Sequence, residues 1–308
     1  MCIQISQKDR GFTLVELLVV ITIIGVLVGL AAGGAWIVRA RAIETMTKAQ
    51  LSQMEIALEA YKNEFGEYPP MLNDGNAVMR HVRSRWKRAS FSDPTVPTPY
   101  DVFLERFGLT GATESQLIAA SLAFWLGGYY DGTSQSYKGF CADLERPWLL
   151  PTEPGGTQRT EVRFDFSDKN TMELGPVRCY AIDKKPVVYF RSTASGEANA
   201  YMRNVGGSFI PLACVLGDFG IAVPYARSKS TESPLVWQAA KKYQLIHPGR
   251  DESFGDRDSV IIDDPASITD PTIFIAYMGD EGGAITYGDY DNIVNFTDTA
   301  TLRGALNQ

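Results

Sequence analysis

The uncharged run from Leu17 to Val38 constrains this chain of 308 residues more than any other feature, because it continues for 22 positions. A helix needs about 20 predominantly apolar residues to cross a bilayer core of about 30 Å. The run is therefore predicted to span a membrane, and Lys8 and Arg10 ahead of it favour a cytoplasmic start. Glu16 directly precedes the run. An ionised carboxylate at the centre of a membrane helix costs about 2.5–3.5 kcal/mol, so we expect Glu16 to have a function.

A short motif surrounds this acid. A polar, basic leader ends at Gly11, and Phe12 lies four residues before Glu16, which places both side chains on one helical face. A cut after Gly11 would create an amine on Phe12 beside the carboxylate. The stretch closely resembles the class III signal of type IV pilins and type II secretion pseudopilins. In those families a prepilin peptidase cuts after the glycine, the new N-terminal Phe is N-methylated, and the Glu directs subunit assembly.

The resemblance implies both sites and a function. Cleavage would fall between Gly11 and Phe12, N-methylation on Phe12, and assembly would depend on Glu16. The chain would be a structural subunit, not an enzyme, of a homo-oligomeric type II secretion pseudopilus or type IV pilus-like filament. Its partners would be the prepilin peptidase, like and related subunits, an inner-membrane assembly platform and membrane lipid. It would cross the inner membrane once, with its head in the periplasm. The alternative is a minor or tip pilin that binds cargo, glycan or DNA.

Two further features of the apolar run bear on this interpretation. Gly25, Gly29 and Gly33 repeat at intervals of four, a pattern that lets membrane helices approach closely. A rival interpretation is an ordinary secretory signal cut near Ala31–Ala32 or Ala35. The apolar region of such a signal is only about 7–15 residues long, which is shorter than this run.

The chain is predicted to have four parts. They are a leader peptide (1–11), a transmembrane and assembly helix (12–38), an amphipathic extension of that helix (39–66) and a periplasmic head (67–308). Within the head, residues 67–180 should form helices and loops, and residues 181–308 mainly strands and an acidic loop. The predicted fold class is α+β and pilin-like, with the long N-terminal helix packed on an antiparallel sheet.

The long helix is expected to run from Thr13 to Phe65. No Gly or Pro interrupts residues 40–65, whereas Gly66 can cap the helix and Pro69 prevents its continuation. Apolar residues in the second half recur at spacings of three and four, which predicts one buried stripe. Its expected members are Ile43, Met46, Met54, Ala57, Leu58, Tyr61 and Phe65.

In the head, a capping box from Thr113 to Gln116 predicts a helix over 117–126 that ends at Gly127. A second, basic helix is expected over 76–89. Strands are expected over 186–191, 208–215, 221–225, 243–246, 259–262 and 273–278, with a last short helix over 298–306. Trp125, Tyr129 and Tyr130 could form a binding patch or the buried end of a helix.

Oxygen-bearing side chains gather in two places late in the chain, and calcium prefers six to eight oxygen ligands. The block resembles the C-terminal loop of major pseudopilins, in which a calcium ion stabilises the subunit. That resemblance implies a possible calcium site formed by Asp251, Ser253 and Asp256 in a first arm and by Asp289 and Asp291 in a second. A long insertion (259–287) separates the two arms here. The alternative is a solvated acidic loop, and no other cofactor is expected.

Other chemistries have weaker signals. The basic helix around Trp86 could contact nucleic acid through phosphates and stacking, but a solvated helix face is the more ordinary interpretation, and nucleic acid is not an expected partner. Ser84 and Lys87 match an SxxK pattern without its companion motifs. His81 and His247 are the only histidines, and His247 is expected to be a turn residue.

Three cysteines remain after removal of the leader, namely Cys141, Cys179 and Cys214. Export to an oxidising compartment would permit one disulfide and one thiol. Three buried free thiols are the other possibility, and the spacing does not choose between them.

Overall fold

The structure is a computed structural model that describes residues 13–193, 199–205, 208–228, 236–255, 276–277 and 292–297. The side chains of residues 30–37 lie outside this description. The chain divides into two compact units, residues 1–45 and residues 46–308.

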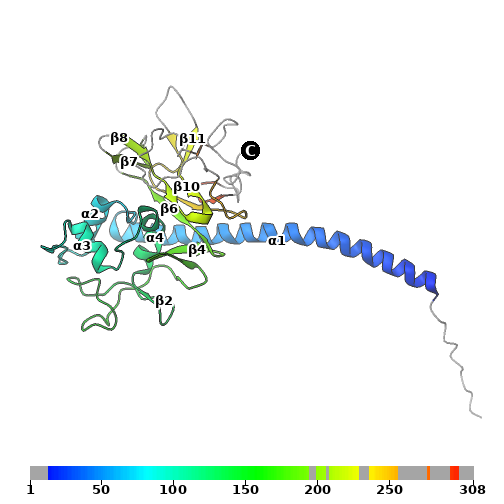
Figure 1. Cartoon of the computed structure of the whole chain (residues 1–308), viewed down its shortest axis with the longest axis horizontal. Coiled ribbons are helices and arrows are strands. Elements are labelled where there is room, and N and C mark those ends of the chain that lie inside the picture. The colour runs from blue at the N-terminus through cyan, green and yellow to red at the C-terminus, as the bar shows by residue number, and fades with distance from the viewer. Residues whose placement is uncertain are drawn as a thin grey trace, which may run out of the picture. The chain divides into compact units, whose positions relative to one another are not determined.

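The first helix, α1, runs without interruption over Leu14–Phe65, as the sequence predicted (Figure 1). It ends where Gly66 adopts a φ of +81°, a conformation that glycine tolerates at little cost. The amide of Gly66 donates a hydrogen bond of 2.7 Å to the carbonyl oxygen of Lys62. Gly66 is therefore the C-terminal cap that the sequence predicted.

A buried stripe lies on the second half of α1, and it contains the predicted members Met54, Ala57, Leu58 and Tyr61. Met46 is 48% exposed, so its assignment to the stripe was wrong. The stripe instead begins at Thr47, the next position along the helix, which is rotated by about 100° from Met46 at 3.6 residues per turn. Its fully buried members are Thr47, Leu51, Met54, Leu58 and Tyr61.

Three more helices follow among the described residues: α2 (Gly75–Arg85), α3 (Pro99–Arg106) and α4 (Glu114–Gly127). The basic helix α2 is shorter than expected because it ends at Arg85, and α3 was not anticipated. The capping box of α4 is confirmed, since the Thr113 side chain accepts from the Gln116 amide and the Gln116 side chain accepts from the Thr113 amide. Residues 117–127 of α4 are all buried, so α4 is a central core helix.

The strands form several small sheets, mostly antiparallel. Three sheets have three strands each, with the orders β3-β4-β5, β15-β13-β6 and β12-β11-β14. Three sheets have two strands each, namely β1-β2, β7-β8 and β10-β9. The pair β11–β14 is parallel. An N-terminal helix followed by antiparallel sheets and further helices gives an α+β fold.

The bounds of the strands are β1 Tyr130–Asp131, β2 Ser136–Tyr137, β3 Thr171–Leu174, β4 Val177–Ile182, β5 Lys185–Pro186, β6 Val188–Arg191, β7 Met202–Val205, β8 Ser208–Pro211, β9 Cys214–Val215, β10 Ile221–Ala222, β11 Tyr225–Ser228, β12 Val236–Trp237, β13 Tyr243–His247, β14 Ala276–Tyr277 and β15 Ile293–Val294. The hairpin β3–β4 begins ten residues before position 181, where mainly strands were expected. The expected strand 259–262 and helix 298–306 lie outside the described residues.

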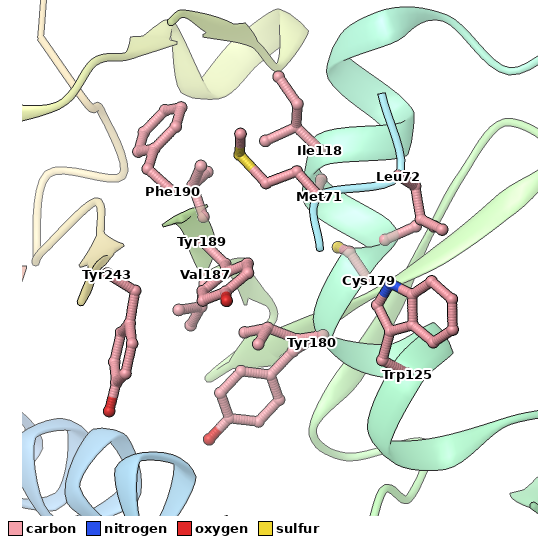
Figure 2. Packing of buried hydrophobic residues seen from close by; sticks show 14 of the residues in the cluster. Met71, Leu72, Ile118, Trp125, Cys179, Tyr180, Val187, Tyr189, Phe190 and Tyr243 are labelled. Carbon is pink, nitrogen blue, oxygen red and sulfur yellow. The ribbon is translucent and has the colours of Figure 1, made fainter. Parts of the chain in front are cut away.

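Helix α4 packs against strands β4, β6 and β9. In Figure 1, β2 and β4 lie on one side of α4, and β7, β8 and β10 lie on the other. Residues 69–72, which follow α1, pack in the core, and aromatic side chains donate hydrogen bonds to their backbone (Figure 2). The Trp125 indole donates to the carbonyl of Pro70 over 2.7 Å, and the Tyr189 hydroxyl donates to that of Pro69 over 2.8 Å. These bonds satisfy carbonyl groups that would otherwise be costly to bury.

A chain of polar contacts fixes the end of α1 to the head. Arg85 donates to the Tyr61 hydroxyl (3.2 Å), which in turn lies 2.6 Å from Nε2 of His81. Nδ1 of His81 lies 2.8 Å from Glu67, and Arg191 donates to the other oxygen of Glu67 over 2.7 Å. A neutral His81 protonated on Nδ1 satisfies every one of these contacts.

These contacts determine the charge states of Glu67 and His81. The hydrogen bond from His81, together with Arg191, lowers the pKa of Glu67 to about 2. Burial lowers the pKa of His81, which favours its neutral form.

Cys141, Cys179 and Cys214 are all buried free thiols, which decides between the two possibilities left open by the sequence. Burial raises the pKa of the Cys179 thiol to about 12, so it stays protonated at neutral pH. Cys179 packs within the core beside α4 (Figure 2), and a buried, protonated thiol of this kind is chemically unreactive.

Candidate processing and assembly site

Glu16 takes part in a capping box at the start of α1. The Thr13 amide and hydroxyl both donate to Oε2 of Glu16, over 2.9 Å and 2.7 Å, and the Glu16 amide donates to the Thr13 hydroxyl over 3.2 Å. Such reciprocal bonds satisfy amides that a helix start leaves without intrahelical partners. Glu16 is thereby held at a defined position one turn into the helix. Gly11 and Phe12 lie outside the described residues.

Thr13 is the residue of this site that the sequence interpretation missed. The pattern Thr-x-x-Glu immediately before an apolar run is itself a signature of a capped helix start. The same pattern precedes α4, where residues 113–116 form the corresponding box.

The helix surface that follows Glu16 is apolar and uncovered. Twelve large apolar side chains between Leu14 and Val28 are 44–80% exposed. A continuous apolar surface of this size marks a site of interaction with protein or membrane. Thr22, within this surface, donates to the carbonyl oxygens of Leu18 and Val19, so its hydroxyl needs no outside partner.

Within the part of the chain that the structure describes, no helix combines the length and the apolar character that crossing a bilayer requires. A transmembrane role for residues 12–38 therefore stays a prediction.

The glycines of this surface are open. A methyl group added at Gly25 or at Gly29 would meet no other atom within 4 Å. Gly25 and Gly29 therefore leave room for another helix, and the role of the small-residue pattern in helix–helix packing stays a prediction.

The predicted calcium residues are described only in part. Asp251 accepts a hydrogen bond from the Ser253 amide over 3.0 Å, which forms a tight turn in the first arm. Asp256, Asp289 and Asp291 lie outside the described residues. The Asn292 side chain donates to the carbonyl of Phe254 over 3.1 Å, so the chain next to the second arm contacts the first. Among the residues described, no group of three or more His, Cys, Asp or Glu is placed to hold a metal, and calcium binding stays a prediction.

The other candidate residues have structural surroundings. Trp86 is 3% exposed and packs against Phe107 and Phe140, so its face is not available to stack on a base. Lys87 lies beyond the end of α2, so it does not share a helical turn with Ser84.

The two histidines serve the fold. His247 is 2% exposed; its Nε2 lies 3.1 Å from the Ile182 carbonyl and its Nδ1 accepts from the Gly249 amide. The expectation that His247 is a turn residue was wrong, because His247 is the last residue of strand β13 and the turn follows it. His81 belongs to the polar contacts at the end of α1.

Comparison with protein families gives a match at the N-terminus. Residues 6–32 match the prokaryotic N-terminal methylation motif, and this range contains Gly11, Phe12 and Glu16. The resemblance to a pilin-type prepilin signal is thereby confirmed. No match was found among curated proteins or among solved structures.

Proposed function

We propose that this chain, which carries a type IV pilin-like methylation motif, is a structural subunit of a type II secretion pseudopilus or type IV pilus-like filament. A prepilin peptidase would cut between Gly11 and Phe12, and Phe12 would then be N-methylated. The observation that carries the proposal is Glu16, fixed at the start of a helix whose apolar surface is exposed.

The geometry at Thr13 supports a mechanism of assembly. Both hydrogen bonds from Thr13 go to Oε2 of Glu16, so Oε1 takes no part in them. The amine of Phe12 in an adjacent subunit would approach Oε1. A lone charge in an apolar interface is costly, whereas a hydrogen-bonded ion pair offsets much of that cost. Assembly would therefore convert two isolated charges into one pair.

Before assembly, residues 12–38 would anchor the chain in the cytoplasmic membrane, with residues 67–308 in the periplasm. The uncharged run of 22 residues and the basic leader support this placement. Membrane lipid and then neighbouring subunits would cover the apolar side chains that the single chain leaves exposed. An inner-membrane platform would join the subunits. No catalytic role is proposed.

The decisive variant is Glu16→Gln, because Gln keeps the length and hydrogen-bonding oxygen of Glu but not its charge. We expect normal cleavage after Gly11 and a filament yield reduced at least about tenfold, measured by mass spectrometry of the N-terminus and by sedimentation of sheared filaments. Thr13→Val is the matched control, since it removes the cap and keeps the charge, and it should assemble far better. Wild-type yield from Glu16→Gln would contradict the mechanism. Native protein that retains residues 1–11 would contradict the function.

A second candidate is a minor or tip pilin whose head binds cargo, glycan or DNA. The size of the head favours it, since residues 67–308 make up most of the chain. Copy number separates the two candidates, because a main subunit is abundant in purified filaments and a tip subunit is rare. Quantitative mass spectrometry of those filaments would measure it.

We also propose that the acidic loops bind calcium, supported by the contact between Asn292 and Phe254 that brings the two arms together. Calcium should raise the melting temperature of the full chain in detergent relative to a chelator, and Asp251→Asn should reduce that shift. The control Glu145→Gln, at an exposed acid elsewhere on the head, should leave it unchanged. Equal melting temperatures with calcium and with chelator would refute the site.

A further inference from the structure

A cavity of about 520 Å³ lies in the head. Its walls come from the end of α3, from α4, from the β1–β2 hairpin, from the loop that follows β2 and from the β3–β4 turn. This volume falls within the range of about 300–1,000 Å³ that is usual for small-molecule sites. Four of its aromatic side chains are neither buried nor fully exposed: Phe107, Tyr129, Tyr130 and Trp148.

An arginine lies over the ring of three of these aromatic residues. The guanidinium of Arg106 is 4.3 Å from the ring centre of Trp148. That of Arg178 is 4.1 Å from Tyr130, and that of Arg159 is 5.5 Å from Tyr129. Arginine stacked in this way keeps planar N–H groups that can bind a carboxylate. The wall therefore alternates flat apolar surfaces with cationic hydrogen-bond donors.

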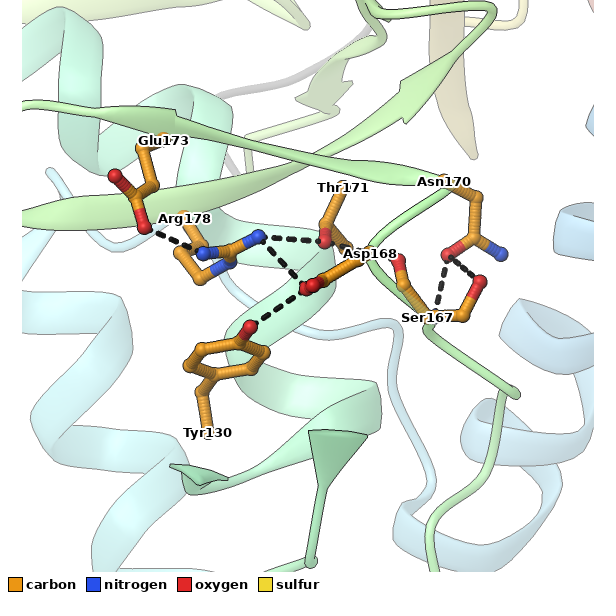
Figure 3. A network of polar contacts seen from close by, with 7 residues as sticks. All are labelled: Tyr130, Ser167, Asp168, Asn170, Thr171, Glu173 and Arg178. Atoms are coloured by element: carbon orange, nitrogen blue, oxygen red, sulfur yellow. Dashed lines mark hydrogen bonds and ion pairs between the residues drawn. The ribbon is translucent and has the colours of Figure 1, made fainter. Parts of the chain in front are cut away.

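The charge of Arg178 is neutralised within the protein. Arg178 pairs with Asp168 over 3.1 Å and with Glu173 over 2.6 Å, and Tyr130 donates to the same oxygen of Asp168 (Figure 3). Arg178 also donates to the Thr171 hydroxyl. These contacts fix the β3–β4 wall, and the two carboxylates more than neutralise the charge of Arg178 there.

The charges of Arg106 and Arg159 are not balanced in the same way. Arg159 donates to the carbonyl oxygens of Gly139 and Leu149, and Arg106 donates to the carbonyl of Ser90. In the described parts of the head, no carboxylate forms an ion pair with either guanidinium. Carbonyl groups orient a cation but do not cancel its charge, so neither guanidinium is neutralised by a direct ion pair among the described residues.

Backbone groups fix the position of Arg159 in the cavity wall. Gly139 has a φ of +71°, and a methyl group there would lie 2.1 Å from the Thr160 carbonyl oxygen. Only glycine fits such a position, and its carbonyl then points at Arg159. The guanidinium is thus placed in the wall by main-chain groups rather than by a chance surface contact.

Two acids complete the lining, Glu105 and Glu153. They would repel a strongly acidic peptide but would accept hydrogen bonds from hydroxyl groups. We propose that this cavity binds an acidic saccharide, with its carboxylate on Arg106 and Arg159, its ring faces against Tyr129 and Trp148, and its hydroxyls on Glu105 and Glu153. This proposal does not depend on filament assembly.

The test is isothermal titration calorimetry on the full chain in detergent, with digalacturonate as the probe. Digalactose, which lacks the carboxylates, should bind at least about tenfold more weakly. Arg106→Gln should weaken digalacturonate binding by about the same factor, and Trp148→Leu should weaken both sugars. Arg83→Gln, an exposed arginine on α2 outside the cavity, is the matched control and should change neither.

Several results would overturn the proposal. Absence of heat with millimolar digalacturonate would do so, as would equal affinity in the wild type and in Arg106→Gln. Tighter binding of tetraglutamate than of digalacturonate would assign the cavity to an acidic peptide. Thermal melts of each variant check that the head is folded. If Arg106→Gln melts early, the loss of affinity in a folded Trp148→Leu variant decides the question, and unchanged affinity there refutes the site.

Discussion

Two helices in this chain begin with the same device in different surroundings. At α1 the capping box pairs Thr13 with Glu16, and at α4 it pairs Thr113 with Gln116. The second box shows that a neutral amide caps a helix of this protein fully. The negative charge of Glu16 is therefore not needed for capping. It precedes an uncharged run, where a carboxylate would cost free energy in a membrane, and this contrast supports the proposal that the charge serves assembly.

The two units also differ in how far their apolar side chains are exposed to solvent. In residues 46–308 the large apolar side chains gather in a core in which Trp125, Tyr61 and Phe103 are almost inaccessible. Between Leu14 and Val28 the large apolar side chains of α1 are 44–80% exposed. Burial within the chain stabilises the head, whereas the N-terminal helix leaves its apolar surface for partners outside the chain.

The largest effect on stability is expected from Trp125→Ala. It removes a buried indole and leaves the Pro70 carbonyl without its donor, so the head should lose about 3–5 kcal/mol of unfolding free energy. Urea denaturation of the full chain in detergent, followed by circular dichroism, measures this. Leu27→Ala in the N-terminal helix is the control, because Leu27 is 60% exposed. A similar loss of unfolding free energy in both variants would show that the exposed side chains of the N-terminal helix stabilise the chain as much as the core of the head does.

A medium effect is expected from pH acting on Glu67 and His81. The pKa of Glu67 is depressed to about 2, so its contribution is complete above its usual pKa of 4.5 and is lost as pH falls toward 2. The pKa of His81 is also lowered, so the unfolded chain binds a proton first and stability falls as pH drops below 6.5. The head should therefore lose stability on acidification.

Glu67→Gln tests the share of this acid dependence that belongs to Glu67. The loss of unfolding free energy between pH 7 and pH 3 should be smaller in the variant, by about 1–2 kcal/mol after allowance for partial solvent screening. Glu145→Gln, an exposed acid elsewhere on the head, should behave like the wild type. An unchanged pH dependence in Glu67→Gln would refute the role of this chain of contacts.

The smallest effect is expected from Thr113→Ala, which should cost the head about 1 kcal/mol because one capping bond is lost. Thr113→Ser keeps the hydroxyl and should retain most of the stability. Thr13→Ala makes the same change at α1 and should leave the melting temperature of the head unchanged. A head destabilised equally by both alanine variants would contradict the separation of the two units.

Much of the fold followed from local patterns. Residues that cap or stop a helix act over three or four positions, so Gly66 and the Thr113 box set their helix ends as predicted. The position of the stripe on α1 was less predictable. Thr47 is polar but fully buried, and its neighbour Met46 is apolar but half exposed, because packing against the head selects the face. Hydrophobicity alone could not make that choice.

The two candidate sites also differ in how far the sequence predicts them. Gly11, Phe12 and Glu16 are read from a contiguous motif, and the family comparison supports that motif. The cavity in the head could not be read in this way. Arg106, Trp148, Arg159 and Arg178 come from three separate segments, and no spacing in the sequence signals that they meet.

The sequence by itself determined the N-terminal signal, the long helix and the α+β class, because each depends on residues close together in the chain. Only the tertiary structure decided that the three cysteines are free, that Trp86 and both histidines are buried, and that arginines stack on aromatic rings around one cavity. These facts depend on contacts between distant segments, and such contacts form when the core closes around α4.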